Sequence, residues 1–541
     1  MNQCSEFIEK LYREFHGYGI KTFQKDLMAG ITVAAVALPL ALAFGVSSGA
    51  DAASGLITAI VASLIIGALS GVSFQISGPT GTMAAILLPL AARFGLKGVF
   101  ITGLLAGVIL ILAGIFKMGK LVYLLPTPVI AGFTSGIAII IALSQIDNFF
   151  GVKTTGKNII ERIASLITNG FRPNSWAVSI GLLVIVLMLL WPKKWGIKVP
   201  GSLVGIVLAT TANMIFNLPI ETVGTIPQTL IHANRISFDD IMAAPWNQLL
   251  LPAVSVAAMC MIESLLCGVA AGRMKDERID GDRELIVQGI SNIVLPFFGG
   301  VPSATALART GVGIKSGQAT RITGIVHGAV LLLSMFLLSP LMAKIPLCSL
   351  GGILIVTAWR MNDRENIRYI FSRRFRWAIA KFSITMLATA VFDLTIAIIA
   401  GVTFSVLYFV VRISHLDVSV SDIDPDKLGY DVEMIEKTQV IYLTGPIFFG
   451  SADALISILV QSDAQNLILS MRGVPLVDVS GVQALTEFMA KENKTLLFAS
   501  VQPEVQRIMR KAKMMEQACS GSFFDTAKDA IEYLDGNMSH K

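Results

Sequence analysis

Charged residues are scarce in this sequence. Asp, Glu, Lys and Arg make up 15% of the 541 residues, whereas hydrophobic residues make up 54%. A soluble protein carries roughly 25% charged residues, so the composition excludes an ordinary soluble protein and indicates a chain that lies mostly in lipid. Many apolar runs approach the ~20 residues that a membrane-spanning helix needs. Clear examples are 27–45, 54–72, 98–116, 176–192 and 319–342.

Cysteine and histidine are also sparse. The five cysteines and five histidines are scattered along the chain and show no disulfide, metal or Ser/His spacing. We therefore predict no metal, no cofactor and no enzymatic activity. The first 25 residues mix charges of both signs without an apolar core, which is not the pattern of a signal peptide. We expect them to form an amphipathic lead-in at the membrane surface.

The basic residues lie mostly in short loops between apolar runs, although a net charge of +6 would also suit a nucleic-acid-binding protein. Basic loops follow the fourth, sixth, eighth and twelfth segments, and the positive-inside rule places such loops in the cytoplasm. The loop at 150–174 is basic as well and departs from the rule. We predict no nucleic-acid partner, but a multi-pass protein of the cell inner membrane with both termini cytoplasmic. About fourteen segments lie between Asp26 and Arg412, two of them short or broken.

The pattern changes after Arg412. The next residues are polar and acidic, and strand-like and helix-like periodicities then alternate, as in TQVIYLTG, ADALISILVQ and NLILSMRG. This alternation predicts a small cytoplasmic α/β domain. The predicted parts are a lead-in at 1–25, a membrane domain at 26–413 with repeats at 26–217 and 247–413, a linker at 414–435 and the α/β domain at 436–541.

Two stretches of small residues interrupt the apolar sequence. They read ISGPTGT at 76–82 and GGVPSATALARTG at 299–311. Pro79 and Pro302 each lie 52 residues after the apolar residue near the start of their repeat, Leu27 and Leu250. Paired interruptions at corresponding positions in two halves are typical of inverted-repeat transporters and mark the substrate site.

Each interruption creates a helix N-terminus, with free N–H groups and about half a positive charge. We expect Pro79 and Pro302 in the first turns of two half-helices, where a missing N–H costs nothing. Two adjoining N-termini would bind an anion, whereas the competing interpretation treats the interruptions as mere kinks. The predicted hydroxyl donors beside these ends are Thr80, Thr82, Ser303 and Thr305.

Two ionisable residues stand out near the interruptions. Glu263 lies in the apolar eighth segment, where a charge costs roughly 2.5–3.5 kcal/mol. A carboxyl group that takes up a proton near neutral pH suits proton coupling, although helix caps or Ser264 could instead satisfy it. Arg309, expected one to two turns into the second half-helix, is always charged. Its predicted role is to strengthen the anion site; the alternatives are a lone partner for Glu263 or a snorkelling cytoplasmic charge.

Five motifs in order resemble the SulP family of sulfate permeases and related anion transporters, and the resemblance covers nearly the whole chain. The C-terminal domain resembles the STAS domain that follows the membrane part in that family. The motifs are DLMAGITVAAVALPLALAFG, SGPT, ESLLCGVAAG, RELIVQGISNIVLPFFGGVP and LARTGVGIKSGQATRITGIVHG.

This resemblance implies a seven-plus-seven inverted repeat of the uracil-permease type. A core of segments 1–4 and 8–11 would carry the anion and move like an elevator against a gate of segments 5–7 and 12–14. The family is usually dimeric, with STAS contributing to the contact. Its anion site lies between the third and tenth segments, which here correspond to Thr80, Gly81, Thr82, Ala304, Thr305 and Ala306.

The resemblance also assigns roles to the charged residues. Arg309 matches an arginine that helps to bind the anion in several members, and Glu263 matches the acidic position that couples a cation. Sodium-coupled bicarbonate members have Asp there and Thr four residues later, whereas this chain has Glu263 and Cys267. Cysteine is a poor sodium ligand because hard cations prefer oxygen. We therefore expect a proton to be coupled at Glu263, Ser264 and Cys267.

The predicted function is secondary active transport of a small anion, such as sulfate, bicarbonate or a dicarboxylate, by proton-coupled symport. The alternatives are a sodium-coupled bicarbonate symporter, an anion exchanger and a nucleobase permease; Arg309 and the STAS domain argue against the last. In STAS, Ser480 takes the place of a phosphorylated serine of anti-sigma-factor antagonists. A regulatory role there ranks low, because Asp478 and Ser480 are also ordinary N-cap residues.

Overall fold

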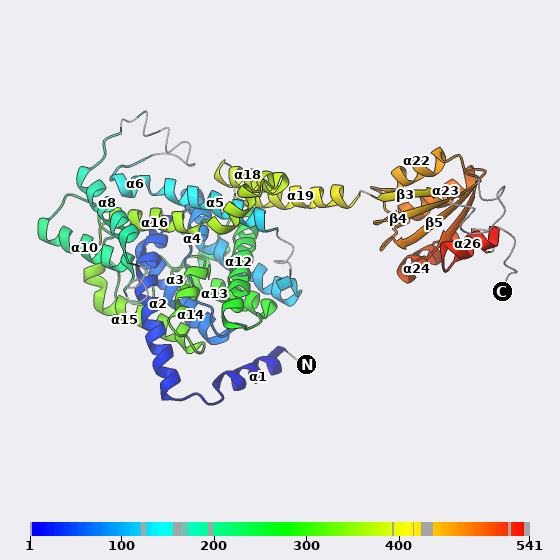
Figure 1. Cartoon of the computed structure of the whole chain (residues 1–541). Helices are drawn as coiled ribbons and strands as arrows, with labels where there is room; N and C mark the ends of the chain where they lie inside the picture. The colour runs from blue at the N-terminus through cyan, green and yellow to red at the C-terminus, as the bar shows by residue number, and fades with distance from the viewer. Residues whose placement is uncertain are drawn as a thin grey trace. The chain divides into compact units, whose positions relative to one another are not determined.

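The computed structural model describes most of the chain as two compact units, residues 1–402 and 403–541 (Figure 1). We describe each unit by itself, and give helix α19 (Leu394–Ile413), which crosses the boundary, with the membrane helices. The described residues are 3–120, 126–154, 165, 168, 171–192, 199–391, 394–414, 416–422, 437–517 and 521–534. Most of the predicted linker, and the basic residues at 193–198, lie outside these ranges.

The membrane unit is helical apart from two short strands. Its elements are α1 (Gln3–Phe15), α2 (Ile20–Ser47), α3 (Ala52–Leu69), β1 (Ser77–Gly78), α4 (Gly81–Ile115), α5 (Thr127–Ser144), α6 (Ile146–Phe150), α8 (Ser175–Leu190), α10 (Gly201–Phe216), α11 (Phe238–Met242), α12 (Trp246–Lys275), α13 (Gly281–Phe298), β2 (Ala304–Thr305), α14 (Leu307–Lys315), α15 (Ile322–Met342), α16 (Leu347–Met361), α17 (Arg364–Ser372), α18 (Arg376–Val391) and α19 (Leu394–Ile413).

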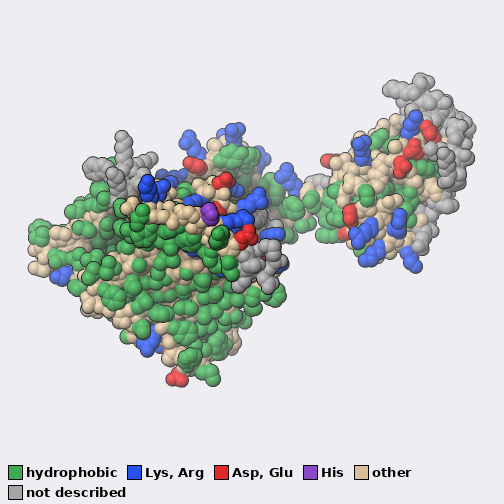
Figure 2. Space-filling model, turned by 90° about the horizontal axis from the view of Figure 1, so that it is seen from below, with side chains coloured by type: hydrophobic (Ala, Val, Ile, Leu, Met, Phe, Trp, Pro, Cys, Tyr) green, Lys and Arg blue, Asp and Glu red, His purple; other side chains and the backbone are tan. Residues whose placement is uncertain are grey.

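Six of the described helices are long and apolar enough to cross a membrane: α2, α3, α4, α5 with α6, α12 and α15. Hydrophobic side chains cover much of the face of this unit seen in Figure 2, and charged side chains gather mainly along its border. A broad apolar surface of this kind is what contact with lipid tails requires. The predicted polytopic helical architecture is confirmed.

The membrane helices form two sets of seven apolar segments. The first set runs from α2 to α10, because Gly95, with a φ of 67°, divides α4 into two segments. The second runs from α12 to α19 without the short α17. The sets meet symmetrically where Gly107 of α4 and Gly289 of α13 adjoin: a Cβ on either would lie 2.6 Å from the other's carbonyl oxygen. The small residues thus permit close backbone packing of the two repeats.

Many helix contacts fall within two groups, and α2 with α10 and α16, and α4 with α5, connect these groups. One group packs α2, α3, the two parts of α4, α12, α13, α14 and α15 against one another. The other packs α5 against α18 and α8 against α10 and α16. These groups correspond to the expected segments 1–4 with 8–11, and to the described members of segments 5–7 with 12–14.

The C-terminal unit carries a five-stranded sheet in the order β3-β4-β5-β6-β7, with only the β3–β4 pair antiparallel. The strands and helices predicted from alternating periodicity are present. One strand, β3, lies in the segment predicted as a linker. The elements are β3 (Asp417–Asp422), β4 (Thr438–Thr444), α22 (Ala452–Gln461), β5 (Asn466–Gly473), α23 (Val479–Lys491), β6 (Thr495–Ala499), α24 (Pro503–Lys511), α25 (Met514–Gln517), β7 (Phe523–Phe524) and α26 (Ala527–Leu534).

Apolar side chains cover both faces of this sheet, which explains why the domain folds around it. Leu469 of β5 packs with α22 and α23, and Ile468 packs with α26. The regulatory candidate Ser480 is the second residue of α23, and the N-cap is Asp478, whose carboxylate accepts a hydrogen bond from the Gly481 N–H at 2.8 Å. Phosphorylation of Ser480 stays an untested prediction.

Candidate functional site

The two interruptions meet as a pair of antiparallel strands. Ser77 of β1 pairs with Thr305 of β2, and Gly78 pairs with Ala304. The Ala306 N–H donates to the Ile76 carbonyl at 3.3 Å. These contacts satisfy backbone groups that would be costly to leave unpaired in lipid. They also place the starts of α4 and α14 beside each other.

Polar side chains of α13 hold the second strand in place. Asn292 accepts from the Ser303 N–H at 2.7 Å and donates to the Ser303 carbonyl at 3.1 Å, as a neighbouring strand would. Gln288 donates to the Thr305 hydroxyl at 2.5 Å. Asn292 and Gln288 were not predicted as site residues, because in sequence they are isolated polar positions in an apolar helix.

The expected positions of the prolines are wrong. Pro79 lies just before the N-cap residue Thr80, and Pro302 lies before β2, four residues ahead of the N-cap residue Ala306. Neither proline is in the first turn of its half-helix. Pro302 instead packs against Gly103 of α4, where a Cβ would lie 2.8 Å from the proline ring. Helix α13 ends at Phe298, close before Pro302, whereas α3 ends at Leu69, well before Pro79, so the second interruption leaves its helix later relative to its proline.

The two half-helices begin differently. The Thr80 side chain caps α4 by accepting a hydrogen bond from the Met83 N–H at 3.2 Å. Ala306, the N-cap of α14, makes no side-chain cap, and the next two residues, Leu307 and Ala308, are exposed. The N–H donors in the first turn of α14 therefore have no side-chain cap.

Arg309 brings a positive charge to the same place. It is the third residue of α14, in the first turn rather than one to two turns along, and its side chain is 1% exposed. One guanidinium nitrogen, Nη2, donates to the Pro79 carbonyl, whereas Nη1 has no hydrogen-bond partner. A Cβ at Gly78 would collide with Nη1, so glycine leaves the space that the guanidinium occupies. Among the described residues no carboxylate forms an ion pair with Arg309 within 4.0 Å, and a buried cation without such a partner favours an anion nearby.

Glu263 lies on the other side of Thr80. The Thr80 hydroxyl donates to Glu263 Oε2 at 2.9 Å, and the Glu263 side chain is partly exposed although it lies in the middle of α12. Among the described residues, no basic side chain forms an ion pair with Glu263 within 4.0 Å. Arg309 and Glu263 thus stand near each other without forming a salt bridge.

Several predicted residues support the strands rather than face the half-helix ends. Ser303 and Thr305 are fully buried and bond to α13, and their role as donors to an anion stays a prediction. The Ser264 hydroxyl accepts from the Thr305 N–H at 3.2 Å and does not satisfy Glu263. Gly81, Thr82, Ala304 and Cys267 are likewise buried.

A second carboxylate, Glu284 of α13, was missed from the sequence. It is fully buried and accepts hydrogen bonds from the Ser70 hydroxyl at 2.6 Å and from Gln288 at 3.1 Å. Gln288 in turn bonds Thr305. Glu284 therefore belongs to the polar support behind β2, whereas Glu263 borders the half-helix ends.

Two interrupted helices that begin side by side, next to a buried cation and within an inverted repeat, define a membrane transporter. The chain belongs to the sulfate permease family, whose model matches residues 23–388; a STAS domain model matches residues 430–530. As a member of this family, the chain is an anion transporter.

Two curated relatives extend over nearly the whole chain. YvdB of Bacillus subtilis (strain 168), provisionally named a sulfate transporter, is 33% identical over 538 residues, which is 94% of this chain and 98% of YvdB. The bicarbonate transporter BicA of Picosynechococcus sp. is 29% identical over 546 residues, covering 94% of this chain and 95% of BicA. Relatives with different named substrates therefore resemble this chain to a similar degree.

Solved structures show the same fold. The transmembrane domain of a cyanobacterial bicarbonate transporter BicA covers 70% of this chain and 98% of its own, with 28% identity and a TM-score of 0.65. Murine solute carrier 26 family member A9, an anion transporter in the inward-facing state, covers 99% of this chain and 97% of its own, with a TM-score of 0.87 at 18% identity. The predicted family and the seven-plus-seven fold are thus confirmed.

Proposed function

We propose that the chain binds one small anion between the starts of α4 and α14 and carries it across the membrane as a secondary active transporter. The observation that carries this proposal is Arg309, buried in the first turn of α14 with Nη1 unpartnered. An anion there would accept hydrogen bonds from Nη1 and from the uncapped N–H groups of Leu307 and Ala308. Sulfate, bicarbonate or a dicarboxylate would each supply suitable acceptor oxygens.

Thr80 offers a physical link between a proton and the anion. The hydroxyl accepts from the Met83 N–H and donates its hydrogen to Glu263. A hydroxyl has one hydrogen and two lone pairs, so a protonated Glu263 can donate to Thr80 instead. The Thr80 hydrogen is then free to turn toward the anion. Protonation of Glu263 would thereby add a donor to the anion site.

The proposed coupling is therefore proton symport through Glu263. Because protonation of Glu263 frees the Thr80 hydrogen for the anion, anion binding should take up a proton and weaken as the pH rises. Sodium symport is the second candidate, because the Thr80 hydroxyl lies 2.9 Å from the Glu263 carboxylate and oxygen is the ligand type that hard cations prefer. Cys267 contributes no oxygen to such a site. Anion exchange would need no coupled cation.

The membrane placement is also part of the proposal. The grouping of helices supports an elevator movement of α2–α4 and α12–α15 against the remaining segments. We place both termini and the STAS domain in the cytoplasm of a cell whose inner membrane holds the protein, on the strength of the basic loops. We further propose a homodimer with a regulatory or assembly role for STAS.

Uptake into proteoliposomes tests this function. The purified full chain is reconstituted, and uptake of labelled sulfate, bicarbonate and fumarate is measured with an imposed proton gradient, a sodium gradient or neither. The proposal expects one of these anions to accumulate with an inward proton gradient at constant sodium. Accumulation that needs sodium at fixed pH would select the second candidate. Uptake that Arg309→Gln leaves unchanged would refute the proposed anion site.

A further inference from the structure

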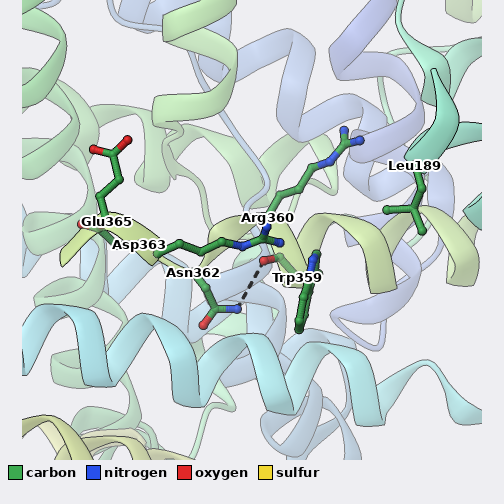
Figure 3. Close-up of a pocket in the computed structure, with 7 residues that line it drawn as sticks. Leu189, Trp359, Arg360, Asn362, Asp363 and Glu365 are labelled. Carbon is green, nitrogen blue, oxygen red and sulfur yellow. Dashed lines mark hydrogen bonds between the residues drawn. The ribbon is translucent and has the colours of Figure 1, made fainter. Parts of the chain in front are cut away.

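A separate cavity of about 480 Å³ lies where α8, α16 and α17 meet. Its lining consists of Leu189 of α8, Trp359 and Arg360 of α16, and residues 362–365, which include Asp363, Arg364 and Glu365. Figure 3 shows this group of residues. None of these residues belongs to the anion site described above. The cavity therefore needs an explanation of its own.

The chain around this cavity is strongly basic. Residues 359–376 contain six arginines and two carboxylates. One carboxylate, Asp363, is occupied by the cap of α17, where it accepts from the Asn366 N–H at 3.1 Å and from the Asn366 amide at 2.5 Å. The other, Glu365, also lines the cavity, with its carboxylate pointing away from Trp359 in Figure 3. Within the described residues, none of the six arginines forms an ion pair.

The two arginines of the cavity are held in place without losing their capacity for a ligand. Arg360 donates from Nη2 to the Met188 carbonyl at 2.7 Å, and the Arg364 guanidinium lies 4.7 Å from the centre of the Trp359 ring. A guanidinium carries five N–H donors, so both side chains keep donors available. Two ordered guanidinium groups suit the oxygens of a phosphate group, which arginine binds bidentately.

The surroundings of the cavity are apolar and aromatic. Leu189, Leu190 and Trp359 are 57%, 76% and 61% exposed, and Tyr369 of α17 and Trp377 of α18, next along the chain, are also exposed. Tryptophan and tyrosine gather where lipid tails meet headgroups. The cavity thus combines arginine side chains for a headgroup with exposed leucine side chains of α8 for an acyl chain.

We propose that this cavity binds the phosphate-bearing headgroup of an anionic phospholipid. The phosphate contacts Arg360 and Arg364, and an acyl chain follows Leu189 and Leu190. The inference rests on the membrane placement proposed above, which puts this end of α16 in the cytoplasmic leaflet, where anionic lipids attract basic segments. A free phosphate offers the same oxygens but has no acyl chain to contact the leucines.

Native mass spectrometry of the purified full chain tests the proposal. The wild type, Arg360→Gln/Arg364→Gln and the matched control Arg373→Gln/Arg374→Gln are titrated in detergent with phosphatidylglycerol, with phosphatidylcholine and with inorganic phosphate. The control removes the same charge from the same segment outside the cavity. We expect the cavity variant to bind phosphatidylglycerol about tenfold more weakly, and the control to change less than about twofold.

Equal weakening in the two variants would overturn the proposal, as would equal binding of phosphatidylcholine or competition by inorganic phosphate. A second measurement does not depend on the folding of the double arginine variant. In the wild type, brominated phosphatidylglycerol should quench tryptophan fluorescence more than in Trp359→Phe, and no difference would also overturn the site. Neither assay involves the transported anion, so failure of the lipid site leaves the anion-uptake test intact.

Discussion

The two interrupted segments share a geometry but differ in chemistry. Each passes through a two-residue strand into a half-helix, and the strands pair with each other. The first half-helix is capped by Thr80, which also bonds Glu263. The second is uncapped and carries the buried Arg309. The inverted repeat therefore builds two half-helices that begin in similar ways. The start of α14 supplies a positive charge and uncapped N–H donors, whereas the start of α4 supplies the Thr80 hydroxyl, whose hydrogen bond can change direction.

Removing the Arg309 charge from the start of α14 should have the largest effect on anion affinity. In Arg309→Gln the anion loses a charge-assisted hydrogen bond, which is worth about 3 kcal/mol at most, so affinity should fall by up to about 100-fold. Equilibrium binding of the transported anion measures this change. Arg309→Lys keeps the charge but not the planar fork, and should lie between the wild type and Arg309→Gln.

Exchanging the carboxylates of Glu263 and Glu284 for amides should separate proton coupling from support of the strand β2. Glu263→Gln resembles the protonated form, so it should retain anion binding, lose the pH dependence of affinity and fail to accumulate anion in a proton gradient. Glu284→Gln places an amide among the donors Ser70 and Gln288, and should lower thermal stability instead. Coupled accumulation by Glu263→Gln would contradict the assignment.

Removing the Thr80 hydroxyl from the start of α4 should have a moderate effect on anion affinity. Thr80→Val loses one hydrogen bond of about 1 kcal/mol to the anion, hence about fivefold in affinity, and should abolish its pH dependence. Thr80→Ser should keep both. Thr102→Val is the matched control, because Thr102 is buried in the same helix and bonds only the Gly98 carbonyl at 2.8 Å; its anion affinity should stay as in the wild type.

Giving α14 an N-cap side chain should make its start resemble the start of α4, which Thr80 caps. In Ala306→Ser, the extended backbone of residue 306 suits a cap, which typically stabilises a helix by about 1 kcal/mol. The serine would occupy an N–H that the anion needs, so binding should weaken about threefold while thermal stability rises. Tighter binding would mean that the uncapped donors of α14 do not face the anion.

The smallest expected effect is on thermal stability and comes from the hydrogen-bonded pair His232 and Asp51, which lies outside the membrane-spanning helices. His232 donates from Nε2 to Asp51 at 3.0 Å, and this hydrogen bond raises the pKa of His232 against the opposing effect of burial. Its stabilisation is present below the unfolded value of about 6.5 and is lost as the pH rises through the folded value. This stabilisation is small because the His232 Nδ1 atom accepts a hydrogen bond from the Asn234 N–H at 3.1 Å. Protonation of Nδ1 disrupts that hydrogen bond.

Thermal unfolding at two pH values measures this contribution. His232→Gln should lower the melting temperature by about 1 °C at pH 5.5 and by less at pH 8. The pH dependence of transport should be the same in His232→Gln as in the wild type. A loss of that dependence would place the proton-sensitive group at the pair rather than at Glu263.

The sequence was most informative where it departed from ordinary helical patterns. The Gly/Pro/Ser/Thr interruptions predicted two broken segments, and Glu263 and Arg309 were visible because charges in apolar runs are rare. The direction of Ser303 and Thr305 was not predictable, because it depends on how β2 pairs with β1 and docks on α13. A one-residue shift of register sends every side chain of a strand to the other face.

Glu284 shows a different limit. In sequence it follows Asp282 and Arg283 at the start of a helix, where an acidic residue is ordinary because it complements the helix dipole. Only tertiary packing brings Ser70 to it and excludes solvent. Likewise, the spacing of the two prolines suggested equal registers, but Pro302 packs against Gly103 in the opposite repeat, a contact that spacing does not encode.

A density map of the full chain, recorded with and without the anion that the uptake assay identifies, tests the central claim most directly. We predict difference density within hydrogen-bond distance of Arg309 Nη1 and of the N–H groups that begin α14. An ordered anion bound elsewhere, with Arg309 Nη1 still unpartnered, would contradict the claim that the two interrupted segments form the anion site.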